Sequence, residues 1–138
     1  MIYNLKLTEL RPGIAVEPYN TLGLEPHSAE NDLIYYVVKE DTTGKEVYSG
    51  AEVKMNYSGY YSNKRLFDSS VKRGASVTYQ IDYGILIEGL DKGILLMREG
   101  EKFRFYIPAE LAYGSYGAFP IVPPDETLIF DVEVIKVY

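Results

Sequence analysis

The sequence predicts an α+β domain in which antiparallel strands pack against one short helix. Several stretches alternate apolar with polar residues, which is the pattern of strands that have one face on a core and the other in water. One stretch instead repeats its apolar residues at intervals of three and four, as a helix with one buried face does. A chain of 138 residues is long enough for one such domain with a single core.

The predicted strands follow one another along residues 33–138, which we expect to form the domain. The first, 33–38, is rich in strand-forming side chains and ends at turn-forming residues 41–45. The later strands have alternating apolar residues, namely Val53, Met55 and Tyr57; Val77, Tyr79 and Ile81; Phe103, Phe105 and Ile107; and Leu128, Phe130, Val132 and Val134. We therefore expect a sheet of about four to six antiparallel strands.

The single predicted helix lies within residues 84–100. Its apolar stripe is formed by Ile87, Leu90, Ile94 and Met97. Gly89 and Gly93 lie inside this stretch and lower its helix propensity by about 1 kcal/mol each. Residues this small would let the helix pack closely against the sheet, which explains why they are tolerated.

Residues 1–32 form an N-terminal extension of a different character. Pro12, Pro18 and Pro26 interrupt regular structure there, and only the alternation in residues 3–7 predicts a short added strand. We expect an extension of the domain and not a second domain. It could dock onto a membrane complex or another copy of the chain, or it could be an inert tether.

Composition excludes several classes of function. The net charge of -6 argues against a nucleic-acid partner, which needs a basic face. The absence of cysteine excludes disulfides, zinc–thiolate sites and thiol catalysis. Residues 1–7 do not resemble a secretory signal, because Lys6 interrupts a short apolar stretch. The compartment stays open: the cytoplasm, or the cell envelope or periplasm if a signal was removed.

Three stretches predict one apolar pocket. They are residues 67–70, 111–114, and 121–124 together with 127–130. Each combines large apolar or aromatic residues with a polar side chain, and none supplies a nucleophile or a cluster of metal ligands. This combination favours a site that binds a peptide and changes its conformation without breaking a bond, and it calls for no cofactor or metal.

Seven motifs in this part of the chain resemble those of FKBP-type peptidyl-prolyl isomerases in order and spacing. They are Tyr57-Ser58-Gly59, Phe67-Asp68-Ser69-Ser70, Gly89-Leu90-Asp91-Lys92-Gly93, Gly100-Glu101-Lys102, Leu111-Ala112-Tyr113-Gly114, Pro123-Pro124 and Thr127-Leu128-Ile129-Phe130. The resemblance covers about residues 33 to 138. It implies a curved antiparallel sheet wrapped around a short helix, and catalysis of rotation about X–Pro bonds.

The resemblance also implies a role for each pocket residue. Asp68 and Tyr113 would be catalytic: an acid beside the pocket, held by Arg73, and a hydroxyl directed at a substrate carbonyl. The substrate-binding lining would consist of Tyr57, Phe67, Val77, Leu86, Ile87, Ile121 and Phe130, with Leu90 as the floor. The Ile87 amide would be a further donor, and residues 115–122 would form a flexible loop over the pocket.

Three positions depart from the commonest family pattern. Leu90 replaces a tryptophan on the floor, Val77 replaces an aromatic wall, and Ala118 with Phe119 alters the overhanging loop. Less aromatic surface makes the pocket wider or shallower. The resemblance therefore implies reduced affinity for macrolide inhibitors such as tacrolimus.

An apolar pocket can catalyse this reaction without an acid or a base. The planar X–Pro amide is stabilised by resonance, and its rotation barrier is about 18–20 kcal/mol. The twisted transition state has less charge on the carbonyl, so that removing water disfavours the planar ground state relatively more.

Alternatives remain at the level of residues and of function. Asp68-Ser69-Ser70 could be an ordinary turn, Tyr113 could cap a loop, and Phe67 and Phe130 could serve the core alone. The predicted function is isomerisation of proline-containing peptides or unfolded proteins, which assists folding. The alternative is a non-catalytic chaperone or assembly module that binds proline-containing segments in the same pocket. We expect a monomer.

Overall fold

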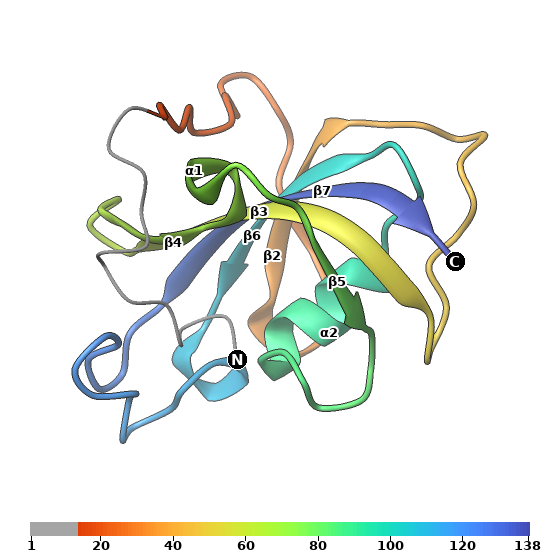
Figure 1. Cartoon of the computed structure of the whole chain (residues 1–138). Helices are drawn as coiled ribbons and strands as arrows, with labels where there is room; N and C mark the ends of the chain where they lie inside the picture. The colour runs from red at the N-terminus through yellow and green to blue at the C-terminus, as the bar shows by residue number, and fades with distance from the viewer. Residues whose placement is uncertain (1–13) are drawn as a thin grey trace.

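One antiparallel sheet is the main element of the computed structural model, which describes residues 14–138 (Figure 1). Its strands are β1 (His27–Ser28), β2 (Ile34–Lys39), β3 (Glu52–Tyr61), β4 (Leu66–Ser69), β5 (Val77–Gln80), β6 (Lys102–Ile107) and β7 (Leu128–Val137). They lie in the order β1-β2-β6-β7-β3-β4, and β5 pairs with the first half of β3. The predicted strand at residues 3–7 lies outside the described residues.

The sheet has more strands than the alternation predicted. The five strands expected within residues 33–138 are confirmed, but the sheet has seven within residues 14–138. The pattern missed β1 and β4, which span only two and four residues, because so short a strand shows too little alternation. It also missed α1 (Ser70–Arg73), which follows β4 directly.

The predicted helix is α2 (Glu88–Ile94), which lies against one face of the sheet (Figure 1). It is shorter than the apolar stripe predicted. After Ile94 the amides of Leu96 and Met97 bond to carbonyls three residues back, so the chain tightens into turns. Met97 nevertheless stays buried, which preserves the stripe.

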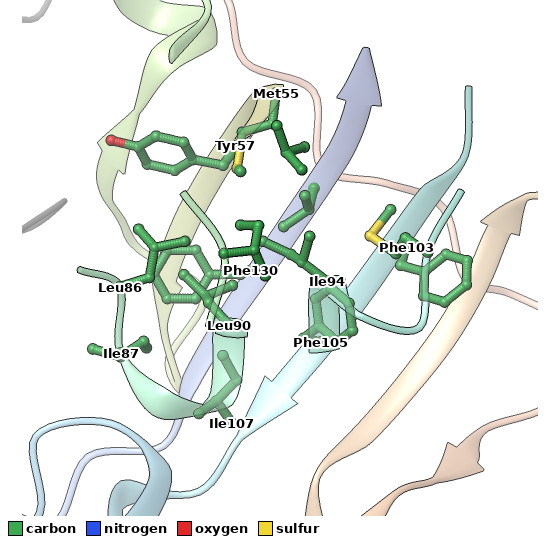
Figure 2. Close-up of a cluster of buried hydrophobic side chains, with 14 of the residues drawn as sticks. Met55, Tyr57, Leu86, Ile87, Leu90, Ile94, Phe103, Phe105, Ile107 and Phe130 are labelled. Atoms are coloured by element: carbon green, nitrogen blue, oxygen red, sulfur yellow. The ribbon is translucent and has the colours of Figure 1, made fainter. Parts of the chain in front are cut away.

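The two glycines of α2 permit its close approach to the sheet, as expected. A Cβ added to Gly89 would lie 2.4 Å from Ile107 Cγ2, and one added to Gly93 would lie 2.6 Å from Phe105 Cε1. The core between helix and sheet includes Ile94, Phe105 and Phe130 (Figure 2). All three are completely buried.

Residues 14–21, here called the strap, cover part of the opposite face of the sheet. The Tyr19 amide donates to Asp131 Oδ2 at 2.9 Å, and Lys102 Nζ lies 5.8 Å from the centre of the Tyr19 ring. Since Phe130 packs toward α2, its neighbour Asp131 points away from the helix. Asp131 is only 3% exposed, so the extension takes part in burying this second face.

The described chain contains two 3-10 turns besides these elements, η2 (Glu30–Asp32) and η3 (Ala109–Leu111). None of the helices within residues 14–138 is both long and apolar enough to cross a membrane.

Candidate active site

Three aromatic rings from three strands meet at one end of α2. The Phe67 and Phe130 rings lie edge to face at 5.8 Å, and the Tyr57 and Phe130 rings are 6.3 Å apart. Gly59 leaves the space for them, since an added Cβ would lie 2.7 Å from Phe130 Cε1 and 2.9 Å from Phe67 Cζ. We call Tyr57, Phe67 and Phe130 the aromatic corner.

A closed hydrogen-bonded network lies beside the aromatic corner. The Tyr57 hydroxyl donates to Asp68 Oδ2 at 2.9 Å, and Arg73 Nη1 donates to Asp68 Oδ1 at 2.8 Å. Arg73 Nη2 also donates to the Tyr57 hydroxyl at 2.9 Å. Asp68 is completely buried, whereas the Arg73 side chain is 21% exposed. Both carboxylate oxygens are therefore engaged, and the network joins β3, β4 and α1.

Burial has a strong effect on the protonation of this network. It raises the pKa of Asp68 above its usual range, against the hydrogen bonds from Arg73 and Tyr57 that lower it. It also raises the pKa of Tyr57, and the negative charge of Asp68 adds to that effect. The Tyr57 hydroxyl thus keeps its proton and remains a donor to Asp68.

Two serines hold α1 and thereby Arg73 in place. Ser69 Oγ accepts from the Lys72 amide at 3.1 Å and so caps the N-terminus of the helix. Ser70 Oγ accepts from the Tyr57 amide at 2.9 Å. Gly74, in the left-handed conformation with φ 76°, ends the helix. The Asp68-Ser69-Ser70 stretch is thus the junction of strand and helix that aims Arg73 at Asp68.

The predicted floor and walls lie next to the aromatic corner. Leu86, Ile87 and Leu90 are each 4% exposed or less, and they belong to the same buried cluster as Tyr57 and Phe130 (Figure 2). Ile87 is the N-cap residue of α2, and its carbonyl accepts from the Leu90 and Asp91 amides. The start of α2 therefore fixes the position of the floor.

The other predicted lining residues lie at the margin of this cluster. Val77, Tyr113 and Ile121 are partly buried and pack against it. Val77 is paired with Met55 of β3, and Ile121 belongs to the overhanging loop. The structure therefore places all the predicted site residues on or around one apolar cluster.

The loop at residues 115–122, expected to be flexible, is closed by its own backbone. The Gly117 amide bonds to the Tyr113 carbonyl, and Ala118 and Val122 bond to each other in both directions. The Phe119–Pro120 peptide bond is cis. These contacts give the loop a defined shape over the site.

Sequence reasoning missed two tyrosines of the site. Tyr61 stacks on Phe67 at 4.8 Å and donates its hydroxyl to the Ile121 carbonyl, so it connects the aromatic corner to the loop. Tyr79 packs against the same buried cluster, and burial, together with the charge of Asp68, raises its pKa. Strand alternation could have indicated both, because Tyr61 shares a face with Tyr57 and Tyr79 shares one with Val77.

The chemistry of the site is that of an apolar cluster with polar groups at its edge. Within residues 14–138 there is no group of three or more His, Cys, Asp or Glu side chains that could hold a metal ion. The arrangement can enclose an apolar ring against the aromatic corner and Leu90. Hydroxyl and guanidinium groups lie at its edge.

The family model for FKBP-type peptidyl-prolyl cis-trans isomerases matches residues 44–135. The chain therefore belongs to this family. An FK506-binding protein of Neisseria meningitidis serogroup B is 43% identical over 95 residues, which cover 69% of this chain and 87% of the relative. A probable FKBP-type peptidyl-prolyl cis-trans isomerase of Haemophilus influenzae is 41% identical over 104 residues, which cover 75% of this chain and 42% of that protein.

Solved structures show the same fold. The crystal structure of AtFKBP13 matches with a TM-score of 0.77 and 34% identity, over 83% of this chain and 99% of the other. FkpA from Escherichia coli matches with a TM-score of 0.75 and 34% identity, over 81% of this chain. That match spans 51% of the FkpA chain.

These similarities confirm three predictions. The fold is α+β and FKBP-like, the family is that of the FKBP-type isomerases, and the chain is a peptidyl-prolyl cis-trans isomerase. They favour the enzyme over a non-catalytic module that would use the same pocket.

Proposed function

We propose that the chain isomerises X–Pro bonds in unfolded or exposed protein segments, with the proline ring held between the aromatic corner and Leu90. The observation that carries this proposal is the buried Tyr57–Asp68–Arg73 network at the edge of an apolar cluster. An enclosed apolar site favours the less polar, twisted amide over the planar one.

In this proposal Asp68 acts through its neighbours. Both of its oxygens already accept hydrogen bonds, so it is a positioning residue that holds Arg73 and Tyr57 in place. Tyr113, which packs at the margin of the cluster, would be the catalytic residue that donates to a carbonyl beside the proline. The Ile87 amide would be a second donor.

NMR exchange on a short X–Pro peptide tests these roles. We expect catalysis by the wild type, and kcat/KM about five- to tenfold lower in Tyr113→Phe, since one hydrogen bond is lost. Tyr116→Phe is the matched control, because Tyr116 lies three residues further along the chain and is 92% exposed. Equal kcat/KM for Tyr113→Phe and the wild type would exclude the role of that hydroxyl. If the wild-type protein bound the peptide without accelerating its cis–trans exchange, the proposed isomerase activity would be contradicted.

We also propose that macrolides of the FK506 type bind this pocket with reduced affinity. The support is Leu90, a smaller side chain than the tryptophan of many relatives, on a floor that is 2% exposed. Leu90→Trp should strengthen inhibition by the macrolide about tenfold through added aromatic contact. Leu96→Trp, at an exposed position, should leave inhibition unchanged. If inhibition were unchanged in Leu90→Trp, Leu90 on the floor would not be the cause of the reduced macrolide affinity.

We further propose that the enzyme acts as a monomer, because all the site residues named above come from one chain. Light scattering at micromolar concentrations should give the mass of one 15.7 kDa chain. A dimer mass would contradict this.

A further inference from the structure

A pocket lies beneath the strap, on the side of the sheet turned away from α2. Its volume is about 270 Å³. It is lined by Pro18, Thr21, Tyr60, Lys64, Arg104, Tyr106 and Ile129. Tyr60, Arg104 and Ile129 are neighbours of Gly59, Phe105 and Phe130, which face the core, so the alternation of the strands directs them away from the isomerase site. The pocket shares none of its lining residues with the aromatic corner.

The charge of this pocket is opposite to that of the chain. Lys64 and Arg104 are both cationic, and no carboxylate lines the pocket, although the whole chain has a net charge of -6. Arg104 Nε and Nη2 bond to the two oxygens of Asp131 at 2.6 and 3.0 Å. This pair fixes the plane of the guanidinium and neutralises its charge. Lys64 forms no salt bridge within the described part of the chain, so one positive charge remains.

Glu17 on the strap is the other carboxylate that acts on this region. Its charge contributes to raising the pKa of Tyr60. The Glu17 and Lys64 side chains are both exposed, so water and salt screen both charges. Of the two, only Lys64 lines the pocket itself, so its ammonium group is the charge that a bound anion would meet.

Tyr60, which lines the pocket, carries a buried hydroxyl that can donate a hydrogen bond. Tyr60 is 5% exposed, and its buried hydroxyl makes no well-formed hydrogen bond within residues 14–138. The Ser58 hydroxyl beside it is already bonded to Ser69 Oγ at 2.9 Å. Burial raises the pKa of Tyr60 to about 12, so the proton is retained at neutral pH. A buried hydroxyl that lacks a well-formed hydrogen bond is unfavourable, so a ligand oxygen that accepts from it would gain affinity.

We propose that this pocket binds a small aromatic monocarboxylate. The carboxylate would accept from Lys64 Nζ and the Tyr60 hydroxyl, while the ring would pack against Pro18 and Ile129. A cavity of about 150 Å³ accommodates benzene, so the observed volume has room for a ring and a short acidic chain. A phosphate dianion would exceed the single positive charge that remains.

The test is an NMR titration of the full chain with phenylpropionate and, in parallel, with its neutral amide. We expect saturable shifts at the backbone amides of Tyr60, Lys64, Arg104 and Ile129. The neutral amide should bind at least about tenfold more weakly, because it lacks the charge-assisted hydrogen bonds.

Two variants separate the contributions of charge and hydroxyl. Lys64→Gln should weaken phenylpropionate binding about tenfold, and Tyr60→Phe about fivefold. Lys136→Gln is the control, since Lys136 is exposed and lies outside the pocket. All three variants should keep the isomerase rate of the wild type, which also shows that they fold.

Three results would overturn the proposal. One is equal binding of the acid and the amide, and another is unchanged affinity in both pocket variants. The third is saturable shifts confined to α2 and the aromatic corner, which would place the acid in the isomerase site. The isomerase assay is a separate measurement, so it tests the proposed function independently of the binding of the carboxylate.

Discussion

At the Asp68 carboxylate, which is completely buried, residues from three elements meet. Asp68 lies in β4, Tyr57 lies in β3 and Arg73 ends α1. The family resemblance implied that Arg73 holds Asp68, and the ion pair at 2.8 Å is present. Sequence reasoning did not foresee that Tyr57 closes the network by bonding to both partners. That closure depends on the pairing of β3 with β4.

Removing the cation of this network should destabilise the fold strongly. Arg73→Ala leaves Asp68, which is completely buried, with an uncompensated charge. We expect a loss of about 3 kcal/mol in the free energy of unfolding, measured by urea denaturation at neutral pH. The isomerase rate should fall as well, because Tyr57 loses a partner.

The double variant Arg73→Ala/Asp68→Asn serves as the control for this prediction. It removes the buried charge together with its partner, so it should regain part of the stability lost in Arg73→Ala. If Arg73→Ala alone cost less than about 1 kcal/mol, the pair would count as a surface ion pair.

At the scale of elements, α1 positions the site although it has only four residues. A helix this short has little stability of its own, so its cap matters. Ser69→Ala removes the cap on the Lys72 amide and should cost about 1 kcal/mol. It should also lower kcat/KM, because Arg73 shifts.

Ser76→Ala is the matched control for Ser69→Ala. Ser76 is exposed and follows α1, so both the urea midpoint and kcat/KM should stay at the wild-type values. A Ser69→Ala variant indistinguishable from Ser76→Ala would show that α1 is held by other contacts.

The packing of α2 sets two effects against each other at Gly93. Gly93→Ala improves helix propensity by about 1 kcal/mol, but its methyl group would lie 2.6 Å from Phe105 Cε1. Overpacking of this kind typically costs about 1–3 kcal/mol, and the Phe105 ring is completely buried. We therefore expect net destabilisation, seen as a lower urea midpoint with an unchanged slope.

The background Phe105→Leu tests the cause of this effect. It removes the ring that the methyl group would meet, so Gly93→Ala should cost less there than in the wild type. An equal cost in both backgrounds would point to a cause other than this contact.

At the scale of the whole molecule, buried tyrosines should make the free energy of unfolding decrease at alkaline pH. Burial raises the pKa of Tyr19, Tyr57 and Tyr60, the last to about 12. In the unfolded chain these phenols ionise near about pH 10. The folded protein then holds protons that the unfolded chain releases. The stabilisation is complete below about pH 10 and falls as the pH rises toward the folded pKa values.

Urea midpoints measured from neutral to strongly alkaline pH check this dependence. The decrease of the urea midpoint with rising pH should be smaller in Tyr60→Phe than in the wild type. Tyr116→Phe should not change it, because Tyr116 is 92% exposed. Midpoints that stay level across the alkaline range would contradict the burial argument.

The strap shows where sequence reasoning about the whole molecule reached its limit. It contains Pro18 and forms neither helix nor strand, but no local pattern indicated a partner for it. That partner is Asp131, a residue near the other end of the chain. A contact of this kind depends on strand order, which brings β7 to the middle of the sheet.

The sequence by itself determined the main strands, the helical stripe and the family, because alternation and motif spacing are local properties of a chain. Only the tertiary structure decided how Tyr57, Asp68 and Arg73 share one network, and that Tyr61 connects Phe67 to the loop. It also decided that the strap covers the second face. These contacts join residues far apart in sequence, and the order and register of the strands select them. The physical reason is that burial and hydrogen-bond geometry depend on which elements pack together.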